Sequence, residues 1–472
     1  MVLHDAAAAA DAAEADAGRG EEKKRRRRKR KGRGRRKKAT AEEILASGFV
    51  RRWAFPDASV NDHDGDGDDG KPTGAAGRVV FEFHSHSTCS DGFLSPTALV
   101  ERAHSKGDLS ESYSAAFSGF ERGLRDPKSL LLLKEQVDVL ALTDHDTMAG
   151  VAEAVEAANK FGIRIIPGVE ISAVYSPREE SETEEPVHIL AYYGSCGPSQ
   201  FEDLENLLAN IRYGRYLRAE EMLVKLSKLK MPLKWEHVAK IAGDGVAPGR
   251  VHVARAMVES GFVENLKQAF SRYLYDGGPA YAKGSEPFAE DVVRLICQTG
   301  GVATLAHPWA LKNPVVVIRS LKASGLHAME VYRSDGKLSG FGDLADRYEL
   351  VKIGGSDYHG RSGQDESDLG SVALPVLAVY EFLKLAQPIW HIAMRDMLSM
   401  FADEPSDINL QKIIRFGKFN LTKEYSGVSC GKDVLDLCLS SWLNNEEREN
   451  SELEAIKVQL SDTVLCDRKK CL

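Results

Sequence analysis

The stretch RVVFEFHSHSTCSDG, residues 78–92, contains the two features that decide the fold. Its first six residues have the buried, β-branched character of a strand in a parallel sheet. His84, His86 and Asp91 follow that strand directly. Side chains at positions i and i+2 of an extended chain point the same way, so His84 and His86 can bind one ion. We therefore predict a strand that delivers metal ligands at its end.

Further strands alternate with helical signals along the chain. The second helical stretch, residues 148–162, ends at a glycine, which is a common stop signal. Alternating β and α units favour a parallel sheet or barrel. The predicted strands after the first are residues 137–142, 163–168, 187–193, 301–306, 326–332 and 350–355.

Ligand-type side chains recur at these strands. In a parallel barrel the carboxyl ends of all strands meet on one face, so separate motifs would converge. Imidazole and carboxylate ligands suit Zn, Mn or Fe, and the lack of cysteine ligands argues against a purely structural zinc site. The sixth strand offers Glu330 and Arg333 instead. The recurring residues are Asp144 and His145 after the second strand, Glu170 after the third, His188 at the start of the fourth, His307 ending the fifth, and Asp357 and His359 after the last.

A different interpretation applies to each residue taken alone. A lone histidine at a strand end is more often a hydrogen-bonded core residue, and a lone Ser-Asp-Gly is usually a turn. Recurrence at consecutive strands favours a metal site. Four other histidines lie in predicted helices or at a strand start and are interpreted as structural: His104, His237, His327 and His391.

The flanking segments differ from the barrel region in composition. Residues 1–77 are predicted to be a disordered tail and linker, and residues 23–38 hold fourteen Lys and Arg without an acid. That tract predicts nuclear import or nucleic-acid contact, or else a solvated tail. Residues 108–135 add an insertion, residues 200–285 a helical insertion, and residues 376–472 a helical C-terminal extension. The region 78–375 is the predicted barrel.

Bulk composition argues against a membrane-spanning protein and against a disulfide-stabilised one. Hydrophobic residues make up 43% of the chain, enough for a core, yet no apolar run is long enough to span a membrane. The seven cysteines are scattered without a CxxC pair, which indicates reduced thiols in the cytoplasm or nucleus. Outside residues 23–38, 48 basic face 70 acidic side chains, so a basic tail precedes an acidic body.

Six motifs in this order, HSHSTCSDG, LTDHDT, GVEIS, HILAYY, AHP and GSDYH, resemble the PHP (polymerase and histidinol phosphatase) phosphoesterases. The resemblance covers residues 79 to about 365 and is closest to nucleoside 3′,5′-bisphosphate phosphatases and 5′–3′ exonucleases. It implies a distorted (β/α)7 TIM-like barrel with two or three divalent ions. The metal ligands that it implies are His84, His86, Asp91, His145, Glu170, His188, His307, Asp357 and His359.

The resemblance also implies roles for individual residues. Asp91, Glu170 and His359 are expected to be catalytic. The first ion would be bound by His84, His86, Glu170 and Asp357, the second by Glu170, His188 and His307, and the third by Asp91, His145 and His359. The residues expected to contact substrate are Asp91, His145, Arg212, Arg215, Arg250 and His359.

The expected activity is therefore hydrolysis of phosphate esters on nucleotides or short nucleic acids. Without the resemblance, the three arginines would be interpreted as solvated helix charges. One alternative is a histidinol-phosphate-type phosphatase, although Arg212 and Arg215 on one helical face suggest a second phosphate. Another is a non-catalytic nucleic-acid-binding scaffold, which the complete ligand set argues against.

Overall fold

The computed structural model describes residues 39–55, 78–105, 136–176, 184–334, 340–361, 366–404, 406–416 and 451–461. The basic tract at residues 23–38 and the insertion at residues 108–135 lie outside these ranges, so the predictions made for them stay predictions.

Seven strands form one sheet in chain order, from β1 to β7. Each overlaps one of the seven predicted segments, so the predicted α/β framework is confirmed, although β3 continues seven residues past its predicted end and includes Glu170. Strands β1, β2, β5 and β6 are fully buried and β3 and β4 mostly so, as expected of strands that are covered on both faces. The strands are β1 Phe81–Glu82, β2 Val139–Leu142, β3 Arg164–Tyr175, β4 Glu185–Tyr192, β5 Val302–Leu305, β6 Ala328–Glu330 and β7 Val351–Ile353.

The sheet is mixed, which corrects the expectation of a parallel sheet. Strand β4 runs antiparallel to both β3 and β5, whereas the other neighbouring pairs are parallel. The physical reason is the length of the connection. Nine residues separate β3 from β4, and a parallel crossover needs about a dozen or more.

The sheet curls until its two ends meet. Beyond β1 and β7, Ser85 and Tyr358 form a parallel bridge, and the His86 N–H donates to the Tyr358 carbonyl at 2.8 Å. Glu82 in β1 accepts hydrogen bonds from the backbone N–H of Ser356 at 2.9 Å and of Gly370 at 2.9 Å. These contacts support the predicted distorted barrel and join the first ligand-bearing loop to the last.

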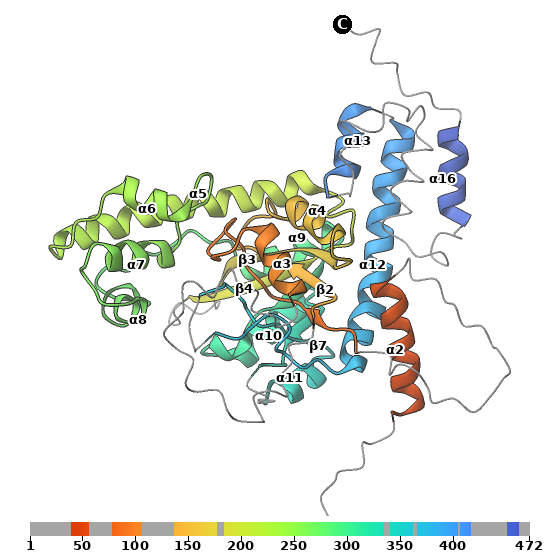
Figure 1. Cartoon of the computed structure of the whole chain (residues 1–472), viewed down its shortest axis with the longest axis horizontal. Coiled ribbons are helices and arrows are strands. Elements are labelled where there is room, and N and C mark those ends of the chain that lie inside the picture. Colours follow the sequence, from red (N-terminus) through yellow and green to blue (C-terminus); the bar gives the residue numbers. More distant parts are fainter. Residues whose placement is uncertain are drawn as a thin grey trace, which may run out of the picture. The chain divides into compact units, whose positions relative to one another are not determined.

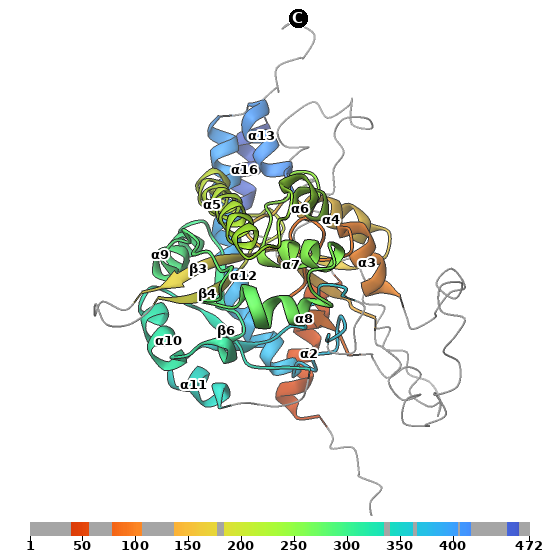
Figure 2. The same cartoon turned by 90° about the vertical axis from the view of Figure 1, so that its left-hand side faces the viewer.

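Helices cover the outside of the sheet (Figure 2). Helix α3 shows how sequence sets such an element, because Ser95 caps the backbone N–H of Ala98 and Pro96 occupies the first turn. Apolar side chains of these helices and of the strands form one large core. The covering helices are α3 Pro96–His104, α4 Val151–Asn159, α9 Ala289–Gln298, α10 Pro314–Ala323 and α11 Phe341–Arg347.

The predicted helical insertion is present between β4 and β5. It has its own apolar core, in which Met222 and Leu226 of the first helix pack with Val253 and Met257 of the third. The insertion is therefore a folded unit and not an extended loop. Its elements are α5 Phe201–Lys228, α6 Trp235–Ala242, α7 Arg250–Glu259, α8 Leu266–Ala269 and the π-helical turn η3 Phe270–Leu274.

Segments at both ends of the described chain pack on the barrel. The prediction of disorder for residues 1–77 is wrong for α2 (Ala41–Ala54), because its buried Trp53 stacks 6.1 Å from Phe81. Helix α12 (Val376–Asp403) places Phe382 4.9 Å from the Phe83 ring. The segment predicted as a C-terminal extension thus begins inside the barrel's own core.

Beyond the barrel, α12 continues against α13 (Asp407–Ile414) and α16 (Ser451–Ser461) through a separate apolar cluster (Figure 1). Among the described residues, no helix combines the length and hydropathy that crossing a membrane requires.

Replacing Phe382 with Ala tests whether α12 is part of the barrel. The ring is fully buried, so its loss should reduce the free energy of unfolding by about 3–5 kcal/mol, measured by denaturant titration. Ile392→Ala, at an exposed position of the same helix, should change it by no more than about 0.5 kcal/mol. Equal, small effects would mean that α12 packs on the barrel only loosely.

Candidate metal centre

The Glu170 carboxylate lies at the centre of a group of histidines. It belongs to β3 and is 1% exposed. Its Oε1 lies 2.8 Å from His188 Nδ1 and 3.0 Å from His307 Nε2. Its Oε2 lies 3.1 Å from His84 Nε2, 3.2 Å from His86 Nε2 and 3.3 Å from His145 Nδ1. Five imidazoles around one carboxylate form a donor set that is typical of transition-metal sites.

The antiparallel direction of β4 explains how His188 reaches this group. In the β3–β4 register, His188 pairs with Ser172, two residues past Glu170. The start of an antiparallel strand lies beside the end of its neighbour, so His188 shares a face with ligands that follow parallel strands. The expectation that only carboxyl ends of strands converge is therefore wrong for β4, although its predicted residue is in place.

The structure brings the nine predicted ligands together. Donor atoms of eight fall into three groups whose members lie within 4.8 Å of one another, and His307 joins them through Glu170. The groups share His86, His145 and Glu170, so neighbouring ions would have common ligands. The three groups are His84, His86, Glu170 and Asp357; His86, Asp91, His145 and His359; and His145, Glu170 and His188.

Buried polar atoms without hydrogen-bond partners show that these residues fit a cation. They include both ring nitrogens of His86, Oδ1 of Asp91 and Nδ1 of His145. His86 Nε2 lies close to Glu170 but is not aligned for a hydrogen bond. Leaving buried polar atoms unpaired is costly, and a bound divalent ion would satisfy them together.

Electrostatics prepare the same atoms for a metal. Burial would raise the pKa of Glu170, but nearby histidines, His145 first, hold it well below the ordinary value. Burial lowers the pKa of His145 to about 3. Burial would also lower the pKa of His86, yet the carboxylates of Asp357 and Glu170, each 3.2 Å from its Nε2, raise it to about 10. A proton on His86 is therefore one that a bound ion would displace.

The backbone is strained where the ligand loops turn. Asp146, His307 and Asp357 adopt φ angles of 56°, 28° and 54°. Such angles are unfavourable for side chains other than glycine, and they persist only where surrounding contacts hold them. In this protein they aim ligand-bearing loops at Glu170.

Two carboxylates hold the predicted ligands in position. Glu330 Oε1 lies 3.1 Å from His84 Nδ1, and its Oε2 accepts a hydrogen bond from the His307 N–H at 2.7 Å. The sequence showed Glu330 at a strand end, but only its contacts define this role. Asp144 was predicted among the ligand-type residues at the strand ends. It instead accepts hydrogen bonds from Ser87 and Ser90 and holds the loop that contains His84 and His86.

The predicted arginines have distinct surroundings. Arg215 donates to Asp146 Oδ2 at 2.6 Å and to Ser172 Oγ at 2.7 Å, while Arg212 donates to the Asp146 carbonyl at 2.8 Å. Both thereby hold the loop that contains His145. Arg250 bonds the half-exposed Asp276 at 2.6 Å.

Sequence reasoning missed Arg218, whose buried Nε lacks a hydrogen-bond partner. Its guanidinium pairs with Glu286 at 2.5 Å. The signal was available, because Arg212, Arg215 and Arg218 follow one another at three-residue spacing along α5.

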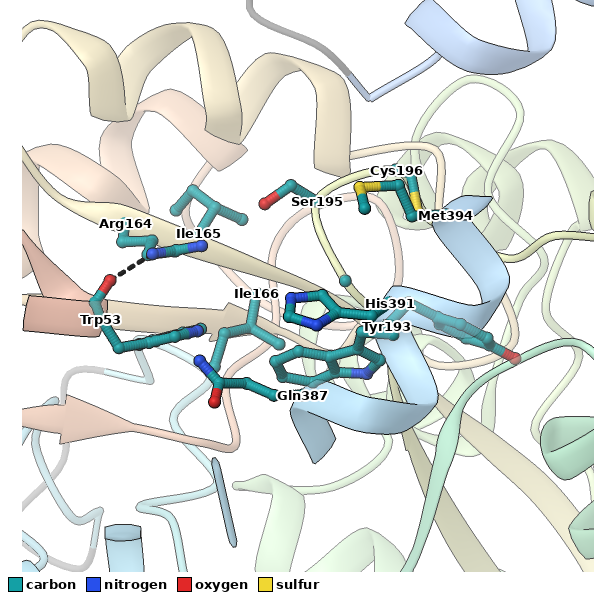
Figure 3. A pocket seen from close by; sticks show the side chains of 12 residues that line it. Trp53, Arg164, Ile165, Ile166, Tyr193, Ser195, Cys196, Gln387, His391 and Met394 are labelled. Carbon is teal, nitrogen blue, oxygen red and sulfur yellow. Dashed lines mark hydrogen bonds between the residues drawn. The ribbon is translucent and has the colours of Figure 1, made fainter. Parts of the chain in front are cut away.

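A pocket of about 830 Å³ extends from the metal-ligand group to the helical insertion. Asp91, His145 and His188 line its inner part, and Arg215, Arg218, Arg250, Lys283 and Lys312 also line it. A different cavity, of only about 30 Å³, lies at the start of β3 and is lined by Trp53, Arg164 and His391 among others (Figure 3). That cavity is about the size of a water molecule and lies away from the ligands.

Replacing Glu330 tests its positioning role. In Glu330→Gln one carboxylate oxygen becomes an amide donor, so His84 or His307 loses its acceptor. We expect a roughly ten- to hundredfold weaker metal affinity, measured by competition with a chelating dye. Glu381→Gln, at an exposed position of α12, should leave affinity unchanged. Unchanged affinity in Glu330→Gln would show that the ligands need no such support.

Comparisons with known proteins agree with this geometry. The PHP domain model matches residues 132–234. The 5′-3′ exoribonuclease of Haemophilus influenzae is 32% identical over 59% of this chain and 89% of its own length. The 3′,5′-nucleoside bisphosphate phosphatase of Chromobacterium violaceum is 29% identical over 62% of this chain and 94% of its own length.

Solved structures extend the likeness to the fold. A Bifidobacterium adolescentis protein described as a metal-dependent phosphoesterase matches at a TM-score of 0.50 with 28% identity, over 64% of this chain and 95% of its own. An amidohydrolase from Chromobacterium violaceum, solved with sulfate and without metal, matches at a TM-score of 0.50 with 28% identity. The match covers 64% of this chain and 96% of that protein. This chain belongs to the PHP family of metal-dependent phosphoesterases and is a hydrolase.

Proposed function

We propose that this enzyme hydrolyses phosphate esters of nucleotides, either nucleoside 3′,5′-bisphosphates or the 5′ ends of short RNA or DNA strands. The observation that carries this proposal is the pocket in which the buried ligand group meets several cationic side chains. The end of the pocket near the histidines and carboxylates would bind the phosphate that reacts. The end lined by arginine and lysine side chains would bind a second phosphate. The relatives with bisphosphatase and exoribonuclease names support the same substrate class.

We assign two or three divalent ions, Mn, Zn or Fe, to the nine predicted ligands. The four-residue group around His84 would hold the first, with the groups around His188 and Asp91 for the others. His307, which touches Glu170, belongs to the second in this assignment. Bound ions would neutralise phosphoryl oxygens and lower the pKa of water from ~15.7 to near ~7.

The chain's own residues supply the proton for the leaving oxygen. His359 Nε2 lies 3.2 Å from Asp91 Oδ1, and both side chains are buried. Asp91 also lines the pocket, so its carboxylate lies between His359 and the substrate. Where only two ions bind and the third site is empty, His359 Nε2 is not a metal ligand and is our candidate proton donor, with Asp91 holding its ring and Glu170 organising the ligands.

Three cations of the pocket are paired with carboxylates in the free protein. Arg250 pairs with Asp276, Arg218 with Glu286, and the exposed Lys283 with Glu184. A substrate phosphate would compete with these carboxylates for the guanidinium groups. We assign Arg250 and Arg218 to the non-reacting phosphate, whereas Arg212 and Arg215 act mainly by holding the His145 loop.

The rival functions fit less well. A histidinol-phosphate-type substrate has one phosphate and needs no second cationic group. A non-catalytic scaffold would not need nine ligands gathered around one buried carboxylate. Nucleic-acid contact through residues 23–38, and a nuclear or cytoplasmic location, stay predictions because that tract lies outside the described residues.

The metal assignment predicts that purified protein carries two or three transition-metal ions and that chelation abolishes phosphatase activity. Removing bound ions should also lower the melting temperature, because ligands that bind only the native state stabilise it. His86→Ala should reduce the bound metal measured by elemental analysis, whereas His237→Ala, which pairs with Glu259 on the insertion, should not. Metal-free protein with full activity would overturn the assignment.

Arg250→Ala tests the second phosphate. A hydrogen bond to a charged group contributes about 1.5–3 kcal/mol, so kcat/KM for a nucleoside 3′,5′-bisphosphate should fall roughly ten- to hundredfold. With p-nitrophenyl phosphate, which has one phosphate, the change should be small. Arg294→Ala, an exposed α9 position paired with Asp291, is the matched control. Equal losses on both substrates would place Arg250 at the reacting phosphate or in the fold.

A further inference from the structure

Phe288 occupies an unusual position at the rim of the large pocket. Its side chain is 52% exposed although it lines that pocket. Its backbone is fixed, because Phe288 bridges to Val174 of β3 and the Val174 N–H donates to the Pro287 carbonyl at 2.9 Å. Phe288 also caps the start of α9. An aromatic ring is thus presented to solvent from a rigid support.

Strand β3 sets the distance between this ring and the metal-ligand group. Val174 lies four residues after Glu170, and that length of strand spans roughly 13 Å. Ser172, Ala173 and Val174 all line the pocket, so the cavity follows the strand outward. A phosphate group alone is much shorter than this span. The cavity therefore has room for the rest of a substrate to extend toward Phe288.

Aromatic and cationic side chains are combined in the outer part of the pocket. Phe270 and Tyr281 line it with Phe288, and the Arg250 guanidinium lies 5.9 Å from the Tyr281 ring. Lys283 adds a largely exposed charge. Aromatic faces with basic groups are the chemistry by which proteins bind unpaired nucleobases and their phosphates.

We infer that Phe288 is a stacking platform for a nucleobase of the substrate. The inference rests on the proposed function and adds recognition of the base to recognition of the phosphates. The base belongs either to a mononucleotide whose phosphate lies at the metal centre or to the next nucleotide of a short strand. Both sources present the same π-face to the ring.

Exposure alone does not carry this inference, because single exposed aromatics are common on protein surfaces. Tyr213 of α5 is 64% exposed and is not among the residues that line the pocket. It therefore provides a control with an exposed aromatic ring that does not line the pocket.

The test compares Phe288→Ala, Phe288→Trp and Tyr213→Ala on three ligands. They are adenosine 3′,5′-bisphosphate, a 5′-phosphorylated triribonucleotide, and ribose 3,5-bisphosphate, which has no base. Turnover is measured with metal, and equilibrium binding is measured by calorimetry with metal-free protein. Loss of one stacked base should weaken binding and raise KM roughly 5- to 150-fold in Phe288→Ala, with ribose bisphosphate unaffected. Phe288→Trp should retain affinity, and Tyr213→Ala should match the parent protein.

The outcomes separate the two levels of the proposal. A loss on the triribonucleotide only would place the second base on Phe288, and a loss on both base-bearing ligands would place the first base there. If Phe288→Ala affects base-bearing and base-free ligands equally, or affects none of them, Phe288 does not stack on a nucleobase. If the parent protein turns over none of the nucleotides, the proposed function is wrong. The binding comparison still decides whether a nucleobase stacks on Phe288.

Discussion

Glu170 is a carboxylate at 1% exposure, and a charge at such a position needs compensation from its surroundings. Five histidine rings within 3.3 Å provide it, and they come from the loops after β1, β2 and β5 and from β4 itself. Because Glu170 is fixed in the middle of the twelve-residue strand β3, every other ligand must approach it. The closure of the barrel through Ser85 and Tyr358 serves this convergence, since it brings the first and last ligand loops together.

The helical insertion supports one loop of the candidate metal centre and lines part of the pocket beside it. Arg212 and Arg215 of α5 hold Asp146, the residue that follows the predicted ligand His145. Part of the insertion thus stabilises the centre, and part, through Arg218 and Arg250, faces the pocket. The same helix therefore links substrate recognition to ligand geometry. Substitutions on α5 are expected to mix the two effects, which is why Arg250 on α7 gives the cleaner test of phosphate binding.

The terminal helices contribute to stability at the far side of the sheet from the covering helices. Trp53 of α2 and Phe382 of α12 pack on Phe81 and Phe83 of the first strand region, and the Trp390 indole donates to the Tyr192 carbonyl at 3.0 Å. These contacts bury strands that carry ligands at their ends. Segments before and after the barrel in sequence are thereby part of what keeps β1 and β4 in place.

The sequence by itself determined the seven strands, the helical insertion and the nine candidate ligands, because strand patterns and ligand motifs are local and follow one another along the chain. Tertiary structure decided what depends on distant partners. The direction of β4 follows from a short connection, the role of Glu330 from contacts with His84 and His307, and the burial of Trp53 from a barrel that forms far downstream. Phe288 resembles any other aromatic residue in the sequence. Only its pairing with Val174 places the ring at the pocket, because side chains separated by more than a hundred residues are brought together by folding alone.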